Sequence, residues 1–472
     1  MSETGNQSLP LLDAPDHVLS TLEGDGSRRW LHPKLSTGRW WKRRRIVGWV
    51  LIAIFVALPH LRIGGKPVVL LDIATRKFVL FGHTFLPTDT LLLALLMVGI
   101  LVTIVLATAL TGRVWCGWGC PQTVYMEFLF RPIDRLFQKT AGKGGKPKRE
   151  VTGLLAVARY AVYLVLCMAL AHTFLAYFVG TERLAQWIRS SPLEHPTAFL
   201  VMGATTALML FDFLFFREQL CLIACPYGRF QSVMLDRQSM IVAYDEKRGE
   251  PRKKGRHLEG DGAGDCVDCH QCVVVCPTGI DIRNGLQMEC INCTQCIDAC
   301  DDVMDRVGKP RGLIRYSSQD ALAGKPPKLL RVRTVLYPVL LAAIGIAFVA
   351  VLSTKYAFDA RLLRGAGNPF HRSQNVGGQG AAIINTFRMR LTNRTDEKRE
   401  YQLELLEPAG AQVDATGGDQ LSLGPNETDL IPMSVKVPQT VFRGMGQAKG
   451  KIRVTDDIGN ERLLDMRLLG PQ

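Results

Sequence analysis

Apolar residues in this chain of 472 residues gather into five long runs that charged segments separate. The runs cover residues 46–61, 90–112, 160–181, 196–211 and 334–354. The second, third and fifth reach the ~20 residues that a helix needs to cross a bilayer core. The fourth continues past Asp212 to Phe216, and the first ends beside Arg62, whose long side chain can reach the headgroups. The pattern therefore predicts a bundle of about five transmembrane helices.

Lysine and arginine flank these runs unevenly. Residues 28–45 and 112–150 each hold eight of them, whereas segments 62–89 and 182–195 hold four and two. Because positive residues are retained on the cytoplasmic side of a membrane, the N-terminus is expected inside and, after five crossings, the C-terminus outside. The net charge of +14 is attributed to contact with anionic lipid, and no nucleic-acid-binding motif accompanies it.

The C-terminal segment shows the two-residue period of strands. Phe387, Met389 and Leu391 alternate with polar neighbours in "TFRMRLTN", and "YQLEL", "LIPMSVKV" and "KIRV" repeat this alternation. Turn-forming stretches such as "GPNE" separate these runs. Short, regularly spaced strands of this kind predict an immunoglobulin-like β-sandwich over residues 370–472.

Eight cysteines between the fourth and fifth apolar runs form two copies of one spacing. "CVDCHQCVVVC" and "CINCTQCIDAC" both read C-x-x-C-x-x-C-x-x-x-C, which holds cubane [4Fe-4S] clusters in bacterial ferredoxins. In such pairs the fourth cysteine of each copy ligates the other cluster. The predicted ligands are Cys266, Cys269, Cys272 and Cys300 for one cluster, and Cys290, Cys293, Cys296 and Cys276 for the other. The sequence therefore predicts two clusters in one ferredoxin-like segment.

Zinc is the main alternative, because C-x-x-C pairs also build tetrahedral zinc sites. A zinc ion needs four thiolates and no exchanged fourth ligand, so eight cysteines in this repeat favour clusters. A disulfide framework fits less well, since closely spaced, regular cysteines suit a metal in a reducing compartment. All 13 cysteines lie at or before Cys300, which agrees with an inside ferredoxin segment and an exported tail.

Two further cysteine pairs follow the second and fourth apolar runs. Cys116 and Cys120 lie in "VWCGWGCP", and Cys221 and Cys225 lie in "QLCLIACP". Residues four apart share one face of a helix, and both runs are expected to end at the same membrane edge, close to the ferredoxin-like segment. Four thiolates that converge there can bind Cu(I), zinc or an iron-sulfur cluster, or cycle through a disulfide. These four cysteines are the predicted copper and redox site.

Other polar residues in or near the runs are assigned structural roles. His60 and His172 are interpreted as polar contacts between helices rather than haem ligands. Asp212 is expected at the membrane interface and Cys167 in apolar packing. His270 lies between two predicted cluster ligands and is expected to tune that cluster through a hydrogen bond.

These assignments divide the chain into five parts. They are a disordered, basic cytoplasmic leader at 1–45, four helices within 46–216, a cytoplasmic ferredoxin-like domain at 217–333, the fifth helix at 334–354 and the β-sandwich at 370–472. The predicted fold class is a multi-domain membrane protein. Its α-helical transmembrane bundle carries an inserted bacterial-type ferredoxin domain and a C-terminal immunoglobulin-like β-sandwich.

Four motifs resemble those of the cytochrome c oxidase accessory family called CcoG, FixG or RdxA. They are "CGWGCPQTV", "CPYGRFQSVM", "CPTGIDIRNGLQMECINCTQCIDACD" and "VGKPRGLIRY". The likeness runs from about Trp40 to Tyr316 and resumes in the tail, which is similar to the family's immunoglobulin-like C-terminal domain. One departure from the ferredoxin pattern is Asp301, which follows Cys300 where proline is usual.

The resemblance implies a multi-pass protein of the bacterial inner membrane, with a cytoplasmic N-terminus and a periplasmic C-terminus. It implies two [4Fe-4S] clusters and a reduction of Cu(II) to Cu(I) that serves the assembly of cbb-type cytochrome c oxidase. The implied partners are oxidase assembly factors, copper chaperones or transporters, and an unidentified electron donor.

Three functions stay open at this point. The first is a cupric reductase, an oxidoreductase with copper as substrate. The second is a quinol-linked electron-transfer subunit, because the same layout resembles the NapH and NosR membrane proteins. The third is a non-enzymatic assembly scaffold whose exported sandwich binds oxidase subunits or copper chaperones.

Overall fold

The chain divides into two compact units in a computed structural model. The described residues are 20–22, 27–86, 89–139, 147–255, 262–326, 331–354, 356–365, 368, 370–373, 382–416, 418, 420–442 and 446–471. One unit comprises Met1–Phe85 and Leu93–Ala347, and the other comprises Leu86–Leu92 and Phe348–Gln472. Residues 1–19 and 23–26 of the predicted leader lie outside the described part of the chain.

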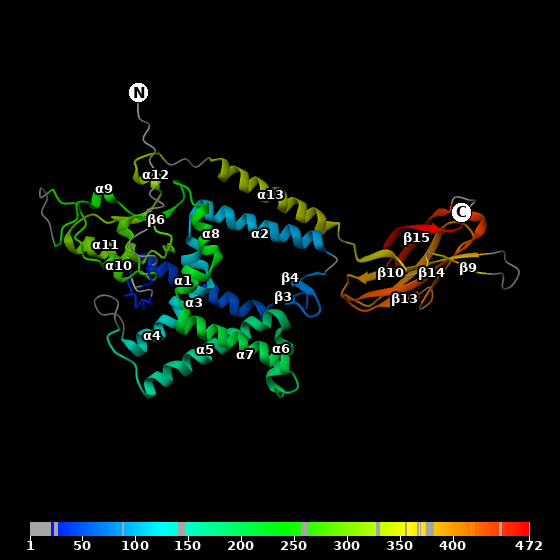
Figure 1. Ribbon diagram of the computed structural model, residues 1–472, viewed down its shortest axis with the longest axis horizontal. Helices are drawn as coiled ribbons and strands as arrows, with labels where there is room; N and C mark the ends of the chain where they lie inside the picture. Colours follow the sequence, from blue (N-terminus) through cyan, green and yellow to red (C-terminus); the bar gives the residue numbers. More distant parts are fainter. Residues whose placement is uncertain are drawn as a thin grey trace, which may run out of the picture. The chain divides into compact units, whose positions relative to one another are not determined.

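Four helices among the described residues are long and apolar enough to cross a membrane (Figure 1). They are α2 (Thr90–Thr111), α5 (Leu154–Val179), α7 (Pro196–Phe211) with its π-helical extension η5 (Asp212–Phe216), and α13 (Val332–Ser353). Large apolar side chains such as Leu101 on α2 and Val165 on α5 are exposed, and α13 buries no residue. Apolar surface of this extent belongs in lipid. These helices confirm four of the five predicted runs as candidate spans.

The remaining run, residues 46–61, forms the apolar part of helix α1 (Arg39–Ala57) and the turn η1 (Leu58–His60). Five of the first seven residues of α1 are Lys or Arg. The apolar part of this helix is therefore too short for α1 to be one of the four candidate spans. Its apolar part nevertheless reaches the far end of α5, because Phe55 stacks on Tyr177 with ring centroids 5.4 Å apart. The Tyr177 hydroxyl also donates to the Phe55 carbonyl at 2.7 Å. Helix α1 includes residues 39–45, the end of the segment that was predicted to be a disordered, basic leader.

Small sheets form between α1 and α2, where the sequence predicted only a loop. Strand β1 (Arg62–Ile63) pairs with β2 (Lys66–Pro67), and β3 (Val69–Asp72), β4 (Lys77–Leu80) and β5 (His83–Phe85) form an antiparallel sheet. This sheet lies at the end of α5 beside α6 (Thr181–Arg189), where Arg183 pairs with Asp72 at 3.1 Å. The two connections therefore lie together, at the end of the helices away from the ferredoxin-like lobe (Figure 1).

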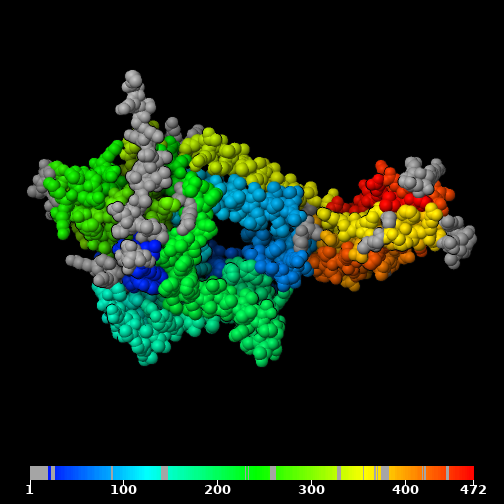
Figure 2. Space-filling model, in the orientation of Figure 1, coloured from blue at the N-terminus to red at the C-terminus, as the bar shows by residue number. Residues whose placement is uncertain are grey.

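The ferredoxin-like lobe is built around two antiparallel strands, β6 (Ile241–Tyr244) and β7 (Ile314–Ser317). The short helices of the lobe are α9 (Glu246–Gly249), α10 (Gln271–Val274), η7 (Ile282–Asn284), α11 (Gln295–Val307) and α12 (Gln319–Leu322). Ile282, Ile297 and Leu313 are buried and pack with the cysteines into its core. The segment forms a compact lobe in the space-filling view, coloured green to yellow-green (Figure 2).

The segment before α1 binds to this lobe. The backbone N–H of Lys34 donates to the carbonyl of Val274 at 3.0 Å, and that of Ser36 donates to the amide oxygen of Gln295 at 3.1 Å. Asp298 of α11 then caps α1, because its carboxylate accepts from the first backbone N–H groups of that helix at 3.1 and 2.7 Å. The N-terminal segment thus fixes α1 against the ferredoxin-like lobe.

The C-terminal segment is a β-sandwich of two antiparallel sheets, as predicted. One sheet has the order β12-β14-β10-β8 with β9 also on β10, and the other has the order β13-β11-β15-β16. The strands are β8 (Phe358–Arg364), β9 (Phe370–Ser373), β10 (Ala382–Asn393), β11 (Arg399–Glu407), β12 (Gln412–Ala415), β13 (Gln420–Leu423), β14 (Thr428–Pro438), β15 (Gln447–Asp456) and β16 (Glu461–Leu469), with the turn η8 (Gln439–Val441). The predicted inward residues Phe387, Met389 and Leu391 are buried between the sheets. The sandwich begins before the predicted residue 370, since β8 pairs with β10.

Candidate functional site

The two ferredoxin-type motifs have the same local backbone. Asp268 and His270 in the first motif, and Asn292 and Thr294 in the second, have positive φ values of 51°, 54°, 53° and 65°. These residues flank the second cysteine of each motif on both sides. Asp, Asn and His tolerate the left-handed region better than most residues, so each motif winds its first three cysteines around one volume.

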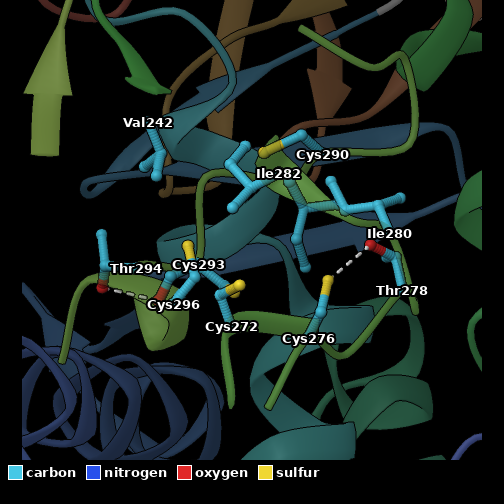
Figure 3. Close-up of a pocket in the computed structure, with 11 residues that line it drawn as sticks. Val242, Cys272, Cys276, Thr278, Ile280, Ile282, Cys290, Cys293, Thr294 and Cys296 are labelled. Atoms are coloured by element: carbon cyan, nitrogen blue, oxygen red, sulfur yellow. Dashed lines mark hydrogen bonds between the residues drawn. The ribbon is translucent and has the colours of Figure 1, made fainter. Parts of the chain in front are cut away.

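A cavity lies inside the second motif (Figure 3). Its cysteines are Cys290, Cys293 and Cys296 of the second motif with Cys272 and Cys276 of the first. Apolar side chains, including Val242, Ile280 and Ile282, complete the walls. The Cys276 thiol lies 3.4 Å from the Thr278 hydroxyl. Cys276 therefore faces the cavity of the other motif, on the side that the ligand exchange predicts.

A second cavity lies inside the first motif. The cysteines that line it are Cys266, Cys269, Cys272 and Cys300. Cys272 lines both cavities, so the two are direct neighbours. Cys269 is the exposed cysteine of this set, whereas Cys266 and Cys272 are buried. This cavity is therefore the one that reaches the surface of the lobe.

Asp301 explains how Cys300 reaches the first motif without the usual proline. The helix α11 continues through Cys300 and Asp301 to Val307, so the missing proline leaves the helix unbroken. The Asp301 carboxylate accepts from the backbone N–H of Gly312 at 2.9 Å. That bond ties α11 to the segment before β7, and the cysteine is directed from within a helix.

The two cavities fit cubane clusters by their donors. Burial raises the pKa of Cys290 to about 11 and those of Cys272 and Cys293 to about 12, so these thiols lose their protons only when a metal replaces them. Among the described residues, no three His, Cys, Asp or Glu side chains lie close enough to hold one metal ion. Cysteines of both motifs line each cavity, and such an exchanged set of thiols suits two polynuclear clusters better than single zinc ions.

The paired cysteines share a second recurring backbone form. The connection after α2 contains η2 (Trp115–Gly119), α3 (Pro121–Tyr125), η3 (Met126–Phe130) and α4 (Arg131–Gln138), and the connection after η5 contains η6 (Leu220–Ala224) and α8 (Pro226–Met234). Both η2 and η6 are π-helical turns, and each ends at the second cysteine of its pair. Cys120 and Cys225 have extended backbones, and the proline that follows each one begins a new helix.

The four paired thiols lie close together at the ferredoxin end of the helices. Burial, together with the charges of Cys120, Cys116 and Cys225, raises the pKa of Cys221 to about 12. Burial raises the pKa of Cys116 to about 11, where Arg113 opposes the shift. All four side chains are half-buried and free of disulfides. The structure thus brings together the pairs that the sequence places on separate spans.

The first pair packs directly on the second ferredoxin-type motif. Gly117 approaches so closely that a Cβ atom there would lie 2.4 Å from the carbonyl oxygen of Ile291. The Trp118 indole N–H donates to the carbonyl of Asn292 at 3.3 Å. Ile291 and Asn292 separate Cys290 from Cys293. Only a residue without a side chain fits at position 117, so the loop of the pair and the cluster motif are in backbone contact.

A buried amide orients one of the paired thiols. The Cys116 thiol donates to the side-chain oxygen of Gln231 at 3.0 Å. The Gln231 amide nitrogen donates in turn to the Tyr227 hydroxyl at 2.6 Å and to the Thr108 hydroxyl at 3.3 Å. Gln231 is fully buried. The motif "CPYGRFQ" therefore supplies a support for the other pair as well as its own cysteine.

The other predicted polar residues have local roles. His172 is half-buried on α5 and its Nδ1 lies 2.7 Å from the carbonyl of Met168 in the same helix, so this contact does not bridge helices as predicted. His60 is exposed. Asp212 accepts from the Gln122 amide at 3.1 Å and thereby joins the end of α7 to α3.

His270 faces Arg283 rather than a cysteine. Its Nδ1 lies 2.8 Å from the Arg283 guanidinium, and Arg283 also bonds the carboxylates of Asp268 and Asp281. The hydrogen bonds to Asp281 and Asp268 raise the pKa of Arg283 against the effect of burial. These four side chains form a network of ion pairs and hydrogen bonds beside the first cavity.

Sequence reasoning missed Arg44, which it treated as one of several topology-determining charges. Arg44 is fully buried, and its Nε donates to the carbonyl of Gly117 at 2.5 Å. Arg44, Gly48 and Ile52 are the buried residues of α1 and recur every four positions. This spacing could have identified Arg44 as buried from the sequence, because it places Arg44 on the same helix face as the apolar Ile52.

Three families match parts of the chain. The family of 4Fe-4S dicluster domains matches residues 216–319, a 4Fe-4S binding domain matches 93–140, and the IG-like fold at the C-terminus of FixG matches 348–471. The second match includes Cys116 and Cys120 of the first pair.

Two proteins of Cereibacter sphaeroides are similar along most of the chain. Protein RdxA is 34% identical over 446 residues, which cover 90% of this chain and 92% of RdxA. Protein RdxB is 32% identical over 473 residues, which cover 94% of this chain and 95% of RdxB. The nitrogen fixation protein FixG of Rhizobium meliloti is 36% identical over 308 residues, which cover 62% of this chain and 57% of that protein.

The four apolar helices and the matched ferredoxin-type domain define a membrane iron-sulfur electron-transfer protein with an immunoglobulin-like C-terminal domain. At this identity and coverage the chain belongs to the FixG/RdxA family.

Proposed function

We propose that this iron-sulfur protein is a cupric reductase that supplies Cu(I) for the assembly of cbb-type cytochrome c oxidase. Cys266, Cys269, Cys272 and Cys300 hold one [4Fe-4S] cluster, and Cys276, Cys290, Cys293 and Cys296 hold the other. Cys116, Cys120, Cys221 and Cys225 bind the copper or relay electrons to it.

One observation carries the proposal. The loop of the first pair is in backbone contact with the residues between Cys290 and Cys293, at Gly117 and Trp118. Electrons that leave a cluster in the second motif therefore have four soft thiols beside them. Each cluster gives up one electron and each Cu(II) takes one. Iron-sulfur potentials span roughly -700 to +450 mV, and thiolate ligands favour the Cu(I) product.

A second candidate function has its own support. The 4Fe-4S binding domain that matches residues 93–140 includes the first pair, so the paired cysteines are also candidates for ligands of a further cluster. Electrons would then pass to another acceptor, such as a quinone. Iron analysis separates the two candidates, because two clusters hold about eight iron atoms per chain and three hold about twelve.

The experiment that tests the copper reaction counts electrons. Anaerobic protein is reduced, freed of reductant and mixed with excess Cu(II) in the presence of a Cu(I)-specific chromophoric chelator. Two clusters predict about two Cu(I) per chain, formed as the cluster absorption returns to that of the oxidised protein. Protein with about eight iron atoms per chain that yields no Cu(I) would rule out the reductase.

We place the chain in the bacterial inner membrane with the N-terminus and the ferredoxin-like domain in the cytoplasm and the sandwich in the periplasm. The Lys and Arg excess before residue 46 supports this orientation. The reach of α1 along α5, from Arg44 at the cysteine end to Phe55 at the far end, supports a fifth crossing. The periplasmic sandwich and the membrane part would then meet oxidase assembly factors and copper chaperones or transporters.

Reporter fusions check this orientation. Alkaline phosphatase fused after Gln472 is expected to be active, because the enzyme folds only when it is exported, and a fusion after Tyr316 is expected to be inactive. Activity assays on cells that carry each fusion provide the measurement, with protein amount determined by immunoblot. Equal activity of both fusions, or the reverse pattern, would contradict the five-crossing orientation.

A further inference from the structure

Arg44 is a buried cation whose guanidinium is only partly bonded. Its side chain is 0% exposed, whereas Arg43 and Arg45 on either side are exposed. The Nε group donates to the carbonyl of Gly117. Both terminal nitrogens are buried and have no hydrogen-bond partner among the described residues. A buried charge in this condition costs several kcal/mol unless an anion compensates it, so the site requires a negative partner.

The helix α1 holds this guanidinium in a fixed position. At its N-terminus the backbone of Trp40 and Trp41 is bonded to the Asp298 carboxylate, which lies between Cys296 and Cys300. One turn after Arg44, Gly48 packs so closely on Phe128 that a Cβ atom would lie 2.5 Å from the ring. The side chain is therefore fixed on both sides rather than free to leave.

Arg44 is joined to the second motif through Gly117, which accepts from its guanidinium and where a Cβ atom would lie 2.4 Å from the carbonyl oxygen of Ile291. Burial raises the pKa of Cys293, and the charge of Arg44 is the largest effect that opposes it. Burial raises the pKa of Cys290 in the same way, and Arg113 opposes it while Glu289 adds to it. Arg113 is itself buried and donates to the carbonyl of Met288 beside this motif. The second motif thus lies between two buried cations.

Neither cation forms an ion pair within the described part of the chain. Glu127 lies near Arg44, whose charge helps to lower the pKa of this carboxyl, but Glu127 is hydrogen-bonded to Arg131 and compensates Arg44 only in part. An anion in the cavity of Cys276, Cys290, Cys293 and Cys296 would supply the missing charge.

The charged side chains beside the first cavity neutralise one another. Its nearby cation, Arg283, bonds the two carboxylates of Asp268 and Asp281 and is neutralised by them. Burial raises the pKa of Cys300, and Asp301 is among the groups that add to this effect. No excess of positive charge therefore faces the first motif, and its Cys269 is exposed.

We propose that Arg44 raises the reduction potential of the cluster beside the paired cysteines above that of the other cluster, so that electrons collect next to the copper site. This inference rests on the proposed function, in which Cys276, Cys290, Cys293 and Cys296 hold a cluster. Reduction adds one negative charge to a cluster, and a buried cation nearby stabilises the added electron. One electron leaves the exposed cluster, which is oxidised, and the cluster beside Arg44 is reduced.

The test measures the potential of the second cluster alone. Cys269→Ser removes a ligand of the exposed cluster, and the remaining cluster is titrated with a redox mediator set under electron paramagnetic resonance. In this background Arg44→Met is expected to reduce the equilibrium constant for reduction at least tenfold, which is about 59 mV for a one-electron couple. Arg44→Lys keeps the charge and is expected to restore most of the potential. Arg45→Met, on the exposed side of α1, is the matched control and is expected to change nothing.

The outcomes separate this inference from the proposed function. In the Cys269→Ser background, about four iron atoms per chain with an unchanged potential in Arg44→Met would overturn the role of Arg44 and leave the second cluster in place. A wild-type chain that binds no iron would overturn both. If Arg44→Met loses the second cluster, Arg44→Lys decides the matter. Retention of iron in Arg44→Lys shows that the charge is needed, and loss of iron there as well shows a packing role and contradicts the inference.

Discussion

Replacing both cysteines of the first pair, Cys116→Ser with Cys120→Ser, is expected to weaken Cu(I) binding at least about 100-fold, or about 2.8 kcal/mol. Serine nearly preserves the size of the side chain but removes the soft sulfur donor that Cu(I) prefers. The rate of Cu(II) reduction should fall with the affinity, since the variant no longer presents the thiols beside the second motif. The iron content should stay at that of the wild type, because the predicted cluster ligands all lie between Cys266 and Cys300.

The measurement is a competition titration against a chromophoric Cu(I) chelator, run together with iron and sulfide analysis of the same sample. Cys167→Ser is the matched control, because Cys167 is a fully buried thiol in α5 and belongs to a separate apolar core. A double variant with wild-type copper affinity would make the pairs structural. A double variant that loses iron would favour the further cluster suggested by the match over residues 93–140.

Iron content in doubly substituted chains is expected to reveal the exchange of the fourth cysteine between the motifs. Cys300→Ser alone should lower the iron content from about eight to about four atoms per chain. Adding Cys269→Ser should change it little further, because both residues line the first cavity. Adding Cys290→Ser instead should remove nearly all iron, because Cys290 lines the other cavity.

The opposite pattern would show that each motif holds its own cluster. In that case Cys290→Ser with Cys300→Ser would retain about four iron atoms, and Cys269→Ser with Cys300→Ser would lose nearly all of them. Circular dichroism of each variant checks that the helices persist. Similar losses in both double variants, beyond the single substitution, would indicate unfolding of the lobe and would be resolved by Cys276→Ser in place of Cys300→Ser.

The two ferredoxin-type motifs and the main architecture could be predicted from the sequence, because they depend on short-range patterns. Ligand spacing identified the two motifs, apolar run length identified four candidate spans, and the alternation around Met389 identified the sandwich. The position of the pairs beside the ferredoxin-like lobe followed from counting crossings. Each of these inferences needs only neighbouring residues and one physical constant, such as the thickness of a bilayer.

The missed features depend on contacts between distant segments. Arg44 lies in a run of charges that resembles any membrane-flanking sequence, and only its packing against Gly117 and Phe128 distinguishes it. Strand β8 follows shortly after the last apolar run, and its pairing with β10 is what shows that it belongs to the sandwich. The sheets between α1 and α2 are built from strands of two to four residues, which carry almost no periodic signal.

Rapid mixing tests directly whether electrons pass from the clusters to copper at the paired cysteines. Fully reduced, anaerobic wild-type protein is mixed with Cu(II) or, separately, with a short-chain quinone, while cluster absorption and Cu(I) formation are followed together. With Cu(II), cluster oxidation and Cu(I) formation are expected to proceed with one rate constant. This rate constant is expected to fall at least about tenfold when Cys116 and Cys120 are replaced by serine. Clusters that stay reduced in the presence of Cu(II) but are oxidised rapidly by the quinone would contradict this electron transfer to copper.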